Sequence, residues 1–279
     1  MNQRSLLGLG PHGFHRIAYV EWGEACSGTV ICAHGLTRNG RDFDRLAAAL
    51  APARRVVCPD MAGRGKSGWL ADGAGYGYPQ YCADMNALIA RLGVESVDWV
   101  GTSMGGLIGL MLAAMPGSPI RRLVLNDIGP LVPKAALVRM AGYVGKDPAF
   151  ADRAALEAYL REVHAAFGPL DDAAWQHLAE HGHRRDEAGG FRLVYDPAIG
   201  RAFSGPLKDV DLWPLWEKVT CPVLVLRGGQ SDLLLRETAE AMTARGPRAR
   251  LVEFAEAGHA PSLMAAHQIA VVNDWLLAP

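Results

Sequence analysis

Short runs of nearly uninterrupted apolar residues recur along the chain and alternate with segments of helical spacing, and this alternation limits the fold more than any other feature. The runs are Gly28–Gly35 (GTVICAHG), Arg54–Asp60, 97–103 (VDWVGTS), Arg122–Asp127, Cys221–Gly229 and 249–254. Strands that are apolar along their whole length are typical of parallel sheets covered by helices on both faces. Arg16–Gly23 alternates apolar and polar residues, which indicates a half-exposed edge strand. We therefore predict an α/β fold with its ligand site beyond the C-terminal ends of the strands.

The alternation stops between Leu131 and Trp216. Three segments there have helical spacing, at 133–145, 152–168 and 171–182, and the strand pattern resumes at Cys221. We predict a core domain formed by 1–130 and 217–279, and a helical cap at 131–216 that covers the C-terminal edge of the sheet.

Composition excludes several classes of function. The chain has 279 residues, of which half are hydrophobic and a fifth charged, and its net charge is −1. This balance gives no electrostatic footprint for nucleic acid or an anionic membrane, so we expect neither as a partner. The five cysteines are odd in number and form no C-x-x-C pair, and we expect reduced thiols and a cytoplasmic protein: Cys26, Cys32, Cys58, Cys82 and Cys221. The sequence leaves a homodimer open.

The stretch GRGKS, residues 63–67, matches the second half of a phosphate-binding loop. The first glycine of that motif would stand at position 60, which is Asp60, and a carboxylate there would repel phosphate. A loop rather than a helix follows Ser67. We therefore predict no nucleotide site, and neither a cofactor nor a metal.

Gly101-Thr102-Ser103-Met104-Gly105 matches G-x-S-x-G between a predicted strand and a predicted helix. A serine on so sharp a turn presents its hydroxyl outwards, and side chains two positions away on either side would collide. The helix N-terminus also places positive partial charge beside a developing oxyanion. Ser103 is therefore the predicted nucleophile.

A serine nucleophile needs a base, and His259 follows the last predicted strand. His34, in CAHG, is better explained as the brace of an oxyanion loop at Gly35 and Leu36. His177, His181 and His183 could indicate a metal, but a solvated helix end explains them better. The remaining histidines are expected at the surface: His12, His15, His164 and His267.

These motifs resemble the capped, cofactor-free α/β-hydrolases. The resemblance rests on Gly101–Gly105, the His34-Gly35 pair, Asp60–Ser67 with its D-x-x-G-x-G-x-S pattern, RGGQSDLL and AGHAP. It implies a mostly parallel central sheet with a helical cap inserted after the sixth strand, and acyl-type hydrolysis by a serine esterase. In that scheme the backbone N–H groups of Leu36 and Met104 hold the oxyanion, supported by the loop residues His34, Gly35, Gly101 and Gly105.

Two carboxylates end suitable strands and could orient His259. Asp232 follows a glycine turn and agrees with the family's Ser…Asp…His order, so it is the predicted acid. Asp127 leads straight into the cap and is interpreted as a hinge carboxylate that binds backbone N–H groups.

For the substrate, the sequence predicts a chemical class rather than one compound. A small, largely apolar carboxylic ester is favoured, with a carbon–carbon bond hydrolase or a lactonase as alternatives on the same triad. A slow-turnover small-molecule receptor is the alternative from another class. Trp213 and Trp216, at the return from the cap to the sheet, are the predicted substrate contacts.

Overall fold

An eight-stranded sheet organises the computed structural model, which describes residues 1–23, 28–187 and 189–278. Its spatial order is β1-β2-β4-β3-β5-β6-β11-β12. Pairing is antiparallel from β1 to β2 and from β2 to β4, and parallel from β4 onwards. The strands are β1 (Asn2–Gly10), β2 (Gly13–Trp22), β3 (Thr29–Ala33), β4 (Arg55–Pro59), β5 (Val97–Thr102), β6 (Ile120–Asn126), β11 (Val223–Gly228) and β12 (Arg250–Phe254). The predicted fold class is confirmed. Strand β1 was not predicted.

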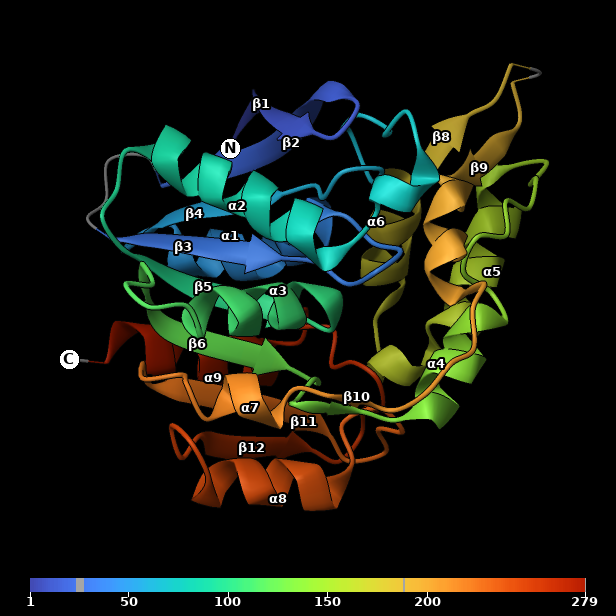
Figure 1. Cartoon of the computed structure of the whole chain (residues 1–279). Helices are drawn as coiled ribbons and strands as arrows, with labels where there is room; N and C mark the ends of the chain where they lie inside the picture. The colour runs from blue at the N-terminus through green and yellow to red at the C-terminus, as the bar shows by residue number, and fades with distance from the viewer. Residues whose placement is uncertain (24–27, 188, 279) are drawn as a thin grey trace.

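Helices cover both faces of the sheet (Figure 1). Alternate residues of each strand point to opposite faces, so Val30 and Cys32 of β3 pack with α1 and α9, while Ile31 and Ala33 pack with α2 and α3. The core helices are α1 (Asp44–Leu50), α2 (Tyr78–Leu92), α3 (Met104–Ala113), α7 (Trp213–Trp216), α8 (Arg236–Ala244) and α9 (Ala266–Leu277), with 3-10 turns η1 (Gly40–Phe43) and η2 (Gly73–Gly75).

A mainly helical segment lies beyond the C-terminal ends of the strands, coloured green to gold in Figure 1. It contains α4 (Lys134–Ala141), α5 (Arg153–Val163), η3 (Ala165–Phe167), α6 (Asp172–His181), β8 (His183–Arg185), β9 (Phe191–Leu193) and η4 (Pro197–Phe203). Its two ends pair with each other, because β7 (Leu131–Val132) is antiparallel to β10 (Val210–Asp211). The insertion therefore leaves and rejoins the core at one point.

The cysteines that the structure describes are free thiols, with Cys32 and Cys58 buried on neighbouring strands. Cys26 lies outside the described residues. Among the described residues, no helix combines the length and the apolar character needed to cross a membrane.

Candidate active site

Ser103 stands between β5 and α3 with φ 50° and ψ −113°, in a region that residues with a side chain rarely occupy. The turn is that tight because backbone crosses closely on both sides. A Cβ on Gly105 would lie 2.0 Å from the carbonyl oxygen of Ala33, and one on Gly101 would lie 2.4 Å from that of Gly105. Only glycine fits at both positions, because any side chain there would collide with this backbone.

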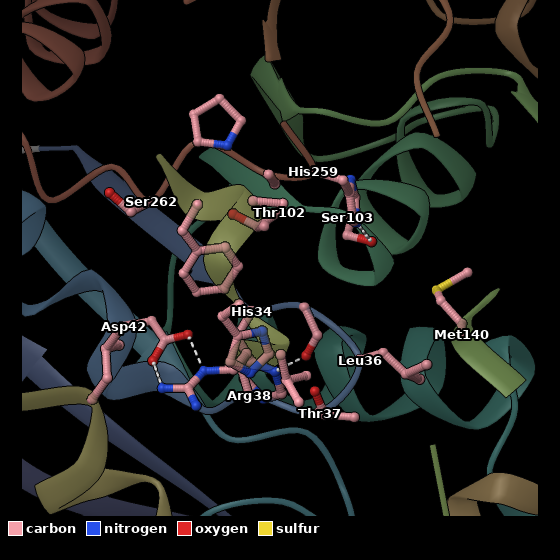
Figure 2. A pocket seen from close by; sticks show the side chains of 18 of the residues that line it. His34, Leu36, Thr37, Arg38, Asp42, Thr102, Ser103, Met140, His259 and Ser262 are labelled. Atoms are coloured by element: carbon pink, nitrogen blue, oxygen red, sulfur yellow. Dashed lines mark hydrogen bonds and ion pairs between the residues drawn. The ribbon is translucent and has the colours of Figure 1, made fainter. Parts of the chain in front are cut away.

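Three side chains from separate strand ends form one hydrogen-bonded chain. The Nε2 atom of His259 lies 3.0 Å from Oγ of Ser103, and its Nδ1 lies 2.7 Å from Oδ2 of Asp127. Because the carboxylate can only accept, Nδ1 carries the proton and Nε2 is left to accept from the serine hydroxyl. Figure 2 shows His259 and Ser103 side by side.

Asp127 is completely buried and its charge is well satisfied. Its Oδ1 accepts from the backbone N–H of Gly228 at 2.7 Å, and its Oδ2 accepts from Oγ of Ser231 at 2.5 Å as well as from His259. Like Ser103, it has a positive φ, 54°, which turns its side chain back toward the strand ends. Three donors converge on this carboxylate, so its position and that of the imidazole are fixed.

The prediction that Asp232 accepts a hydrogen bond from His259 is therefore wrong. The side chain of Asp232 is 52 % exposed and forms a bidentate ion pair with Arg139 of α4, with Nε at 2.5 Å and Nη2 at 2.9 Å. The turn that precedes it, closed by the N–H of Ser231 on the carbonyl of Gly228, directs Ser231 inwards and leaves Asp232 outside.

The two tryptophans predicted as substrate contacts also need correction. Trp216 is fully buried and donates its indole N–H to the carbonyl of Arg245, and Trp213 lies under the guanidinium of the same arginine. Within the described residues neither lines a cavity that reaches Ser103. The short helix α7 that carries them packs on α3 of the core, so these indoles anchor the return from the cap.

The loop around Leu36 is held by two buried basic side chains. His34 accepts the N–H of Met61 at Nε2, 2.9 Å, and donates from Nδ1 to the carbonyl of Gly35, 2.7 Å. Burial lowers the pKa of His34 to about 4, so the ring stays neutral, as the bond from Met61 requires. Arg64, also completely buried, donates from Nε to the carbonyl of Leu36 at 2.9 Å.

Sequence reasoning missed Arg64, although it lies within the GRGKS stretch. That stretch is a tight turn in which Asp60 accepts the N–H groups of Gly40 and Lys66, both at 2.8 Å. The Lys66 ammonium reaches outwards to Gln3. The Asp60 carboxylate therefore accepts backbone N–H groups of its own loop and of Gly40, and Arg64 of the same loop reaches the carbonyl of Leu36.

Two cavities meet at Ser103. The polar cleft, of about 80 Å³, includes His259 and charged or hydroxyl side chains from the core and the cap, and part of it appears in Figure 2. The apolar cavity, of about 350 Å³, includes Met104 and is lined mainly by aliphatic, methionine and aromatic side chains. Leu36, Ser103 and Met140 line both. A bound molecule can therefore extend in two directions from Ser103, into surroundings of different polarity.

Two histidines expected at the surface are not there. His15 is buried and bonds to Asp84 at 2.9 Å. His164 lines the polar cleft, where burial lowers its pKa to about 3. Both lie in segments whose tertiary partners are distant in sequence, and no local pattern marks them.

His177 and His181 lie against the core rather than at a solvated helix end, and with Asp44 they place three ligand atoms within 4.8 Å of one another. These are groups that could hold a divalent cation. Here both oxygens of Asp44 are bonded to Arg41, and Nε2 of His177 donates to the carbonyl of Arg41. The cluster joins α6 to α1 and lies outside both cavities at Ser103 within the described residues.

Comparison with known proteins identifies a family and several relatives. A family model described as alpha/beta hydrolase fold matches residues 28–265. The chain is 48 % identical over 280 residues to a 3-hydroxybutyrate-oligomer hydrolase of Cupriavidus necator, an alignment that covers 96 % of this chain and 94 % of the relative. It is 30 % identical over 213 residues to a 2-(acetamidomethylene)succinate hydrolase of Mesorhizobium japonicum, covering 76 % and 74 %.

Among solved structures, an alpha/beta hydrolase from Novosphingobium aromaticivorans superposes with a TM-score of 0.88 at 36 % identity, and the match covers 99 % of this chain and 97 % of that one. The likeness therefore includes the cap as well as the core.

Proposed function

The chain belongs to the α/β-hydrolase family, and from this premise we propose that it is a serine hydrolase that cleaves short oligomers of a 3-hydroxy acid at their ester bonds. The observation that carries the proposal is the chain of hydrogen bonds from Ser103 through His259 to Asp127. The order Ser…Asp…His is kept with Asp127 as the acid.

In the proposed reaction, Oγ of Ser103 attacks the ester carbonyl carbon while Nε2 of His259 takes its proton. Asp127 stabilises the imidazolium that forms. The carbon–oxygen bond then breaks, and the leaving alkoxide takes the proton from Nε2. Water repeats the sequence on the acyl-enzyme, releasing the acid and restoring Ser103. Each proton that leaves a nucleophile is returned to a leaving group, so no other reactant is needed.

The oxyanion would be held by the backbone N–H groups of Leu36 and Met104. Met104 is the first residue of α3, and a first-turn N–H has no acceptor within its helix. Leu36 lies in the loop that His34 and Arg64 brace from behind. These two hydrogen bonds hold the N–H group of Leu36 in place before negative charge develops on the substrate oxygen. A donor that is already in place stabilises that charge without any rearrangement.

The substrate class rests on two supports. The Cupriavidus relative, at 48 % identity, is named for hydrolysing 3-hydroxybutyrate oligomers, whose links are carboxylic esters of a small hydroxy acid. The apolar cavity of about 350 Å³ offers room for a short acyl group beside the nucleophile. The proposed substrate is therefore more specific than the small apolar ester predicted from the sequence: it is an ester whose acyl and alcohol halves differ in polarity.

The test is hydrolysis of the linear 3-hydroxybutyrate dimer and trimer by purified protein, followed by chromatography of the released acid, with Ser103→Ala as the inactive control. A neutral aryl butyrate, a lactone and a vinylogous diketone complete the panel. Efficient cleavage of the lactone or the diketone with the dimer untouched would favour the alternative hydrolases. Binding without turnover of any member would favour a receptor.

A further inference from the structure

The position of His259 fixes the direction in which an ester must lie. The same Nε2 atom that takes the serine proton must give it to the leaving alkoxide, so the alcohol half of the substrate has to lie against this imidazole. His259 lines the polar cleft and is not among the described residues that line the apolar cavity. The alcohol half therefore leaves through the polar cleft, and the acyl half occupies the apolar cavity.

This direction places a negative charge in the polar cleft. In a linear oligomer of a 3-hydroxy acid, the free carboxylate belongs to the last unit, which is the alcohol half of the last ester bond. Two carbons separate that carboxylate from the leaving oxygen. The cleft must therefore offer a cation a short distance beyond His259, since a carboxylate is costly to cover without a partner.

Besides His259 and His34, whose two ring nitrogens are bonded to Met61 and Gly35, three basic side chains line the cleft. Burial lowers the pKa of His164 to about 3, so it is neutral at neutral pH. Arg38 is only 5 % exposed and donates to both oxygens of Asp42, at 2.7 and 2.8 Å (Figure 2). Moving Arg38 would leave Asp42 without its counterion in a part-buried site, which is strongly unfavourable. Neither residue is available to a substrate.

Arg139 has the freedom that the other two lack. Its side chain is 43 % exposed, and its partner Asp232 is 52 % exposed, so their ion pair contributes little to stability. Asp232 engages Nε and Nη2, whereas an arginine has five N–H groups. Tyr143, which also lines the cleft, lies close enough to interact with the same guanidinium. Arg139 can therefore donate to a second carboxylate, or exchange Asp232 for another carboxylate, at a small cost in free energy.

We propose that Arg139 is a carboxylate-binding residue that holds the free acid group of the leaving 3-hydroxy acid in the polar cleft, and that Asp232 occupies its guanidinium when no substrate is bound. The inference rests on the proposed function and adds to it which end of the substrate the protein recognises. It makes the enzyme selective for oligomers that end in a free acid. It also gives Asp232 a role in substrate binding in place of the one the sequence predicted.

The test compares the dimer acid with its terminal carboxamide, which has nearly the same shape and no charge. The readout is the ratio of kcat/KM for the acid to that for the amide. Arg139→Gln should lower the ratio by about 10- to 100-fold, mainly through KM for the acid, because a hydrogen-bonded charge is lost. Arg139→Lys should lose less, since it keeps the charge. Asp232→Asn should raise the ratio about two- to five-fold by removing a competing carboxylate.

Arg161→Gln is the matched control, because it removes another partly exposed cap ion pair, with Glu157 and Asp172, outside both cavities. Its ratio should equal that of the wild type. Lys208 lines the apolar cavity. If the ratio falls in Lys208→Gln and not in Arg139→Gln, the free carboxylate lies in the apolar cavity and the proposal is overturned.

Two further outcomes distinguish failure of the carboxylate site from failure of the proposed function. An equal ratio in Arg139→Gln and wild type, with both dimers cleaved, overturns the carboxylate site and leaves the proposed function standing. If neither dimer is cleaved while an aryl butyrate is, the proposed substrate class itself fails.

Discussion

Replacing Asp127 by asparagine should remove most of the activity, because the oxygen that now accepts from Nδ1 of His259 becomes an amide nitrogen. The remaining amide oxygen would keep the 2.7 Å bond from the N–H of Gly228, since turning the amide over would set two donors against each other. The imidazole would then carry its proton on Nε2 and point it at Ser103, so the serine would lose its base.

The expected loss follows from these contacts. Asparagine in place of the aspartate of a Ser-His-Asp triad lowers kcat by about 10⁴-fold, because it fixes the wrong tautomer and removes the charge that stabilises the imidazolium. That factor corresponds to about 5 kcal/mol of transition-state stabilisation. The backbone should tolerate the change, because asparagine adopts a positive φ such as the 54° at this position more readily than most residues.

The assay is kcat on a neutral aryl butyrate, with the thermal midpoint of unfolding measured in parallel. Asp232→Asn is the control, and its exposed ion pair predicts a kcat within about three-fold of wild type. The reasoning is refuted if Asp232→Asn loses orders of magnitude while Asp127→Asn stays within ten-fold of wild type, with both proteins folded.

Three further predictions concern the frame of the site. Gly105→Ala should destabilise the fold by about 3 kcal/mol or more, because its Cβ would overlap the Ala33 carbonyl, whereas Gly205→Ala, which meets no atom within 4 Å, should stay within about 0.5 kcal/mol in urea unfolding. Folded His34 binds fewer protons than the unfolded chain between pH 6.5 and 4, so acidification through that window should cost roughly 3 kcal/mol of stability at this residue. His34→Gln should make the fall in unfolding free energy with pH shallower, and an unchanged slope would contradict the assignment. Replacing residues 133–209, the part of the predicted cap that lies between β7 and β10, by a short linker keeps the core helix α7 and should alter the preference among acyl chain lengths more than the folding of the sheet; a wholly unfolded product would show that the segment belongs to the core.

Local patterns in the sequence are enough to predict the fold class and the turn that carries Ser103. A run of apolar residues specifies a buried strand wherever it occurs, and G-x-S-x-G specifies its turn through contacts among Gly101, Ser103 and Gly105. His259 was found for the same reason, since its place after the last strand can be counted along the chain. The prediction that GRGKS forms a tight turn likewise rests on one residue, Asp60.

Which carboxylate meets His259 depends on contacts that form only in the folded chain. Strands β6 and β11 are parallel neighbours, so Asp127 and Asp232 end at the same edge of the sheet and the sequence offers both. The choice depends on the direction of two turns, through the positive φ of Asp127 and the bond from Ser231 to its carboxylate. The residue type at one position does not determine how either turn points its carboxylate. Each orientation results from contacts between segments about a hundred residues apart in the sequence. The same reason hid Arg64 and the two cavities, whose walls come from core and cap segments that meet only when the chain is folded.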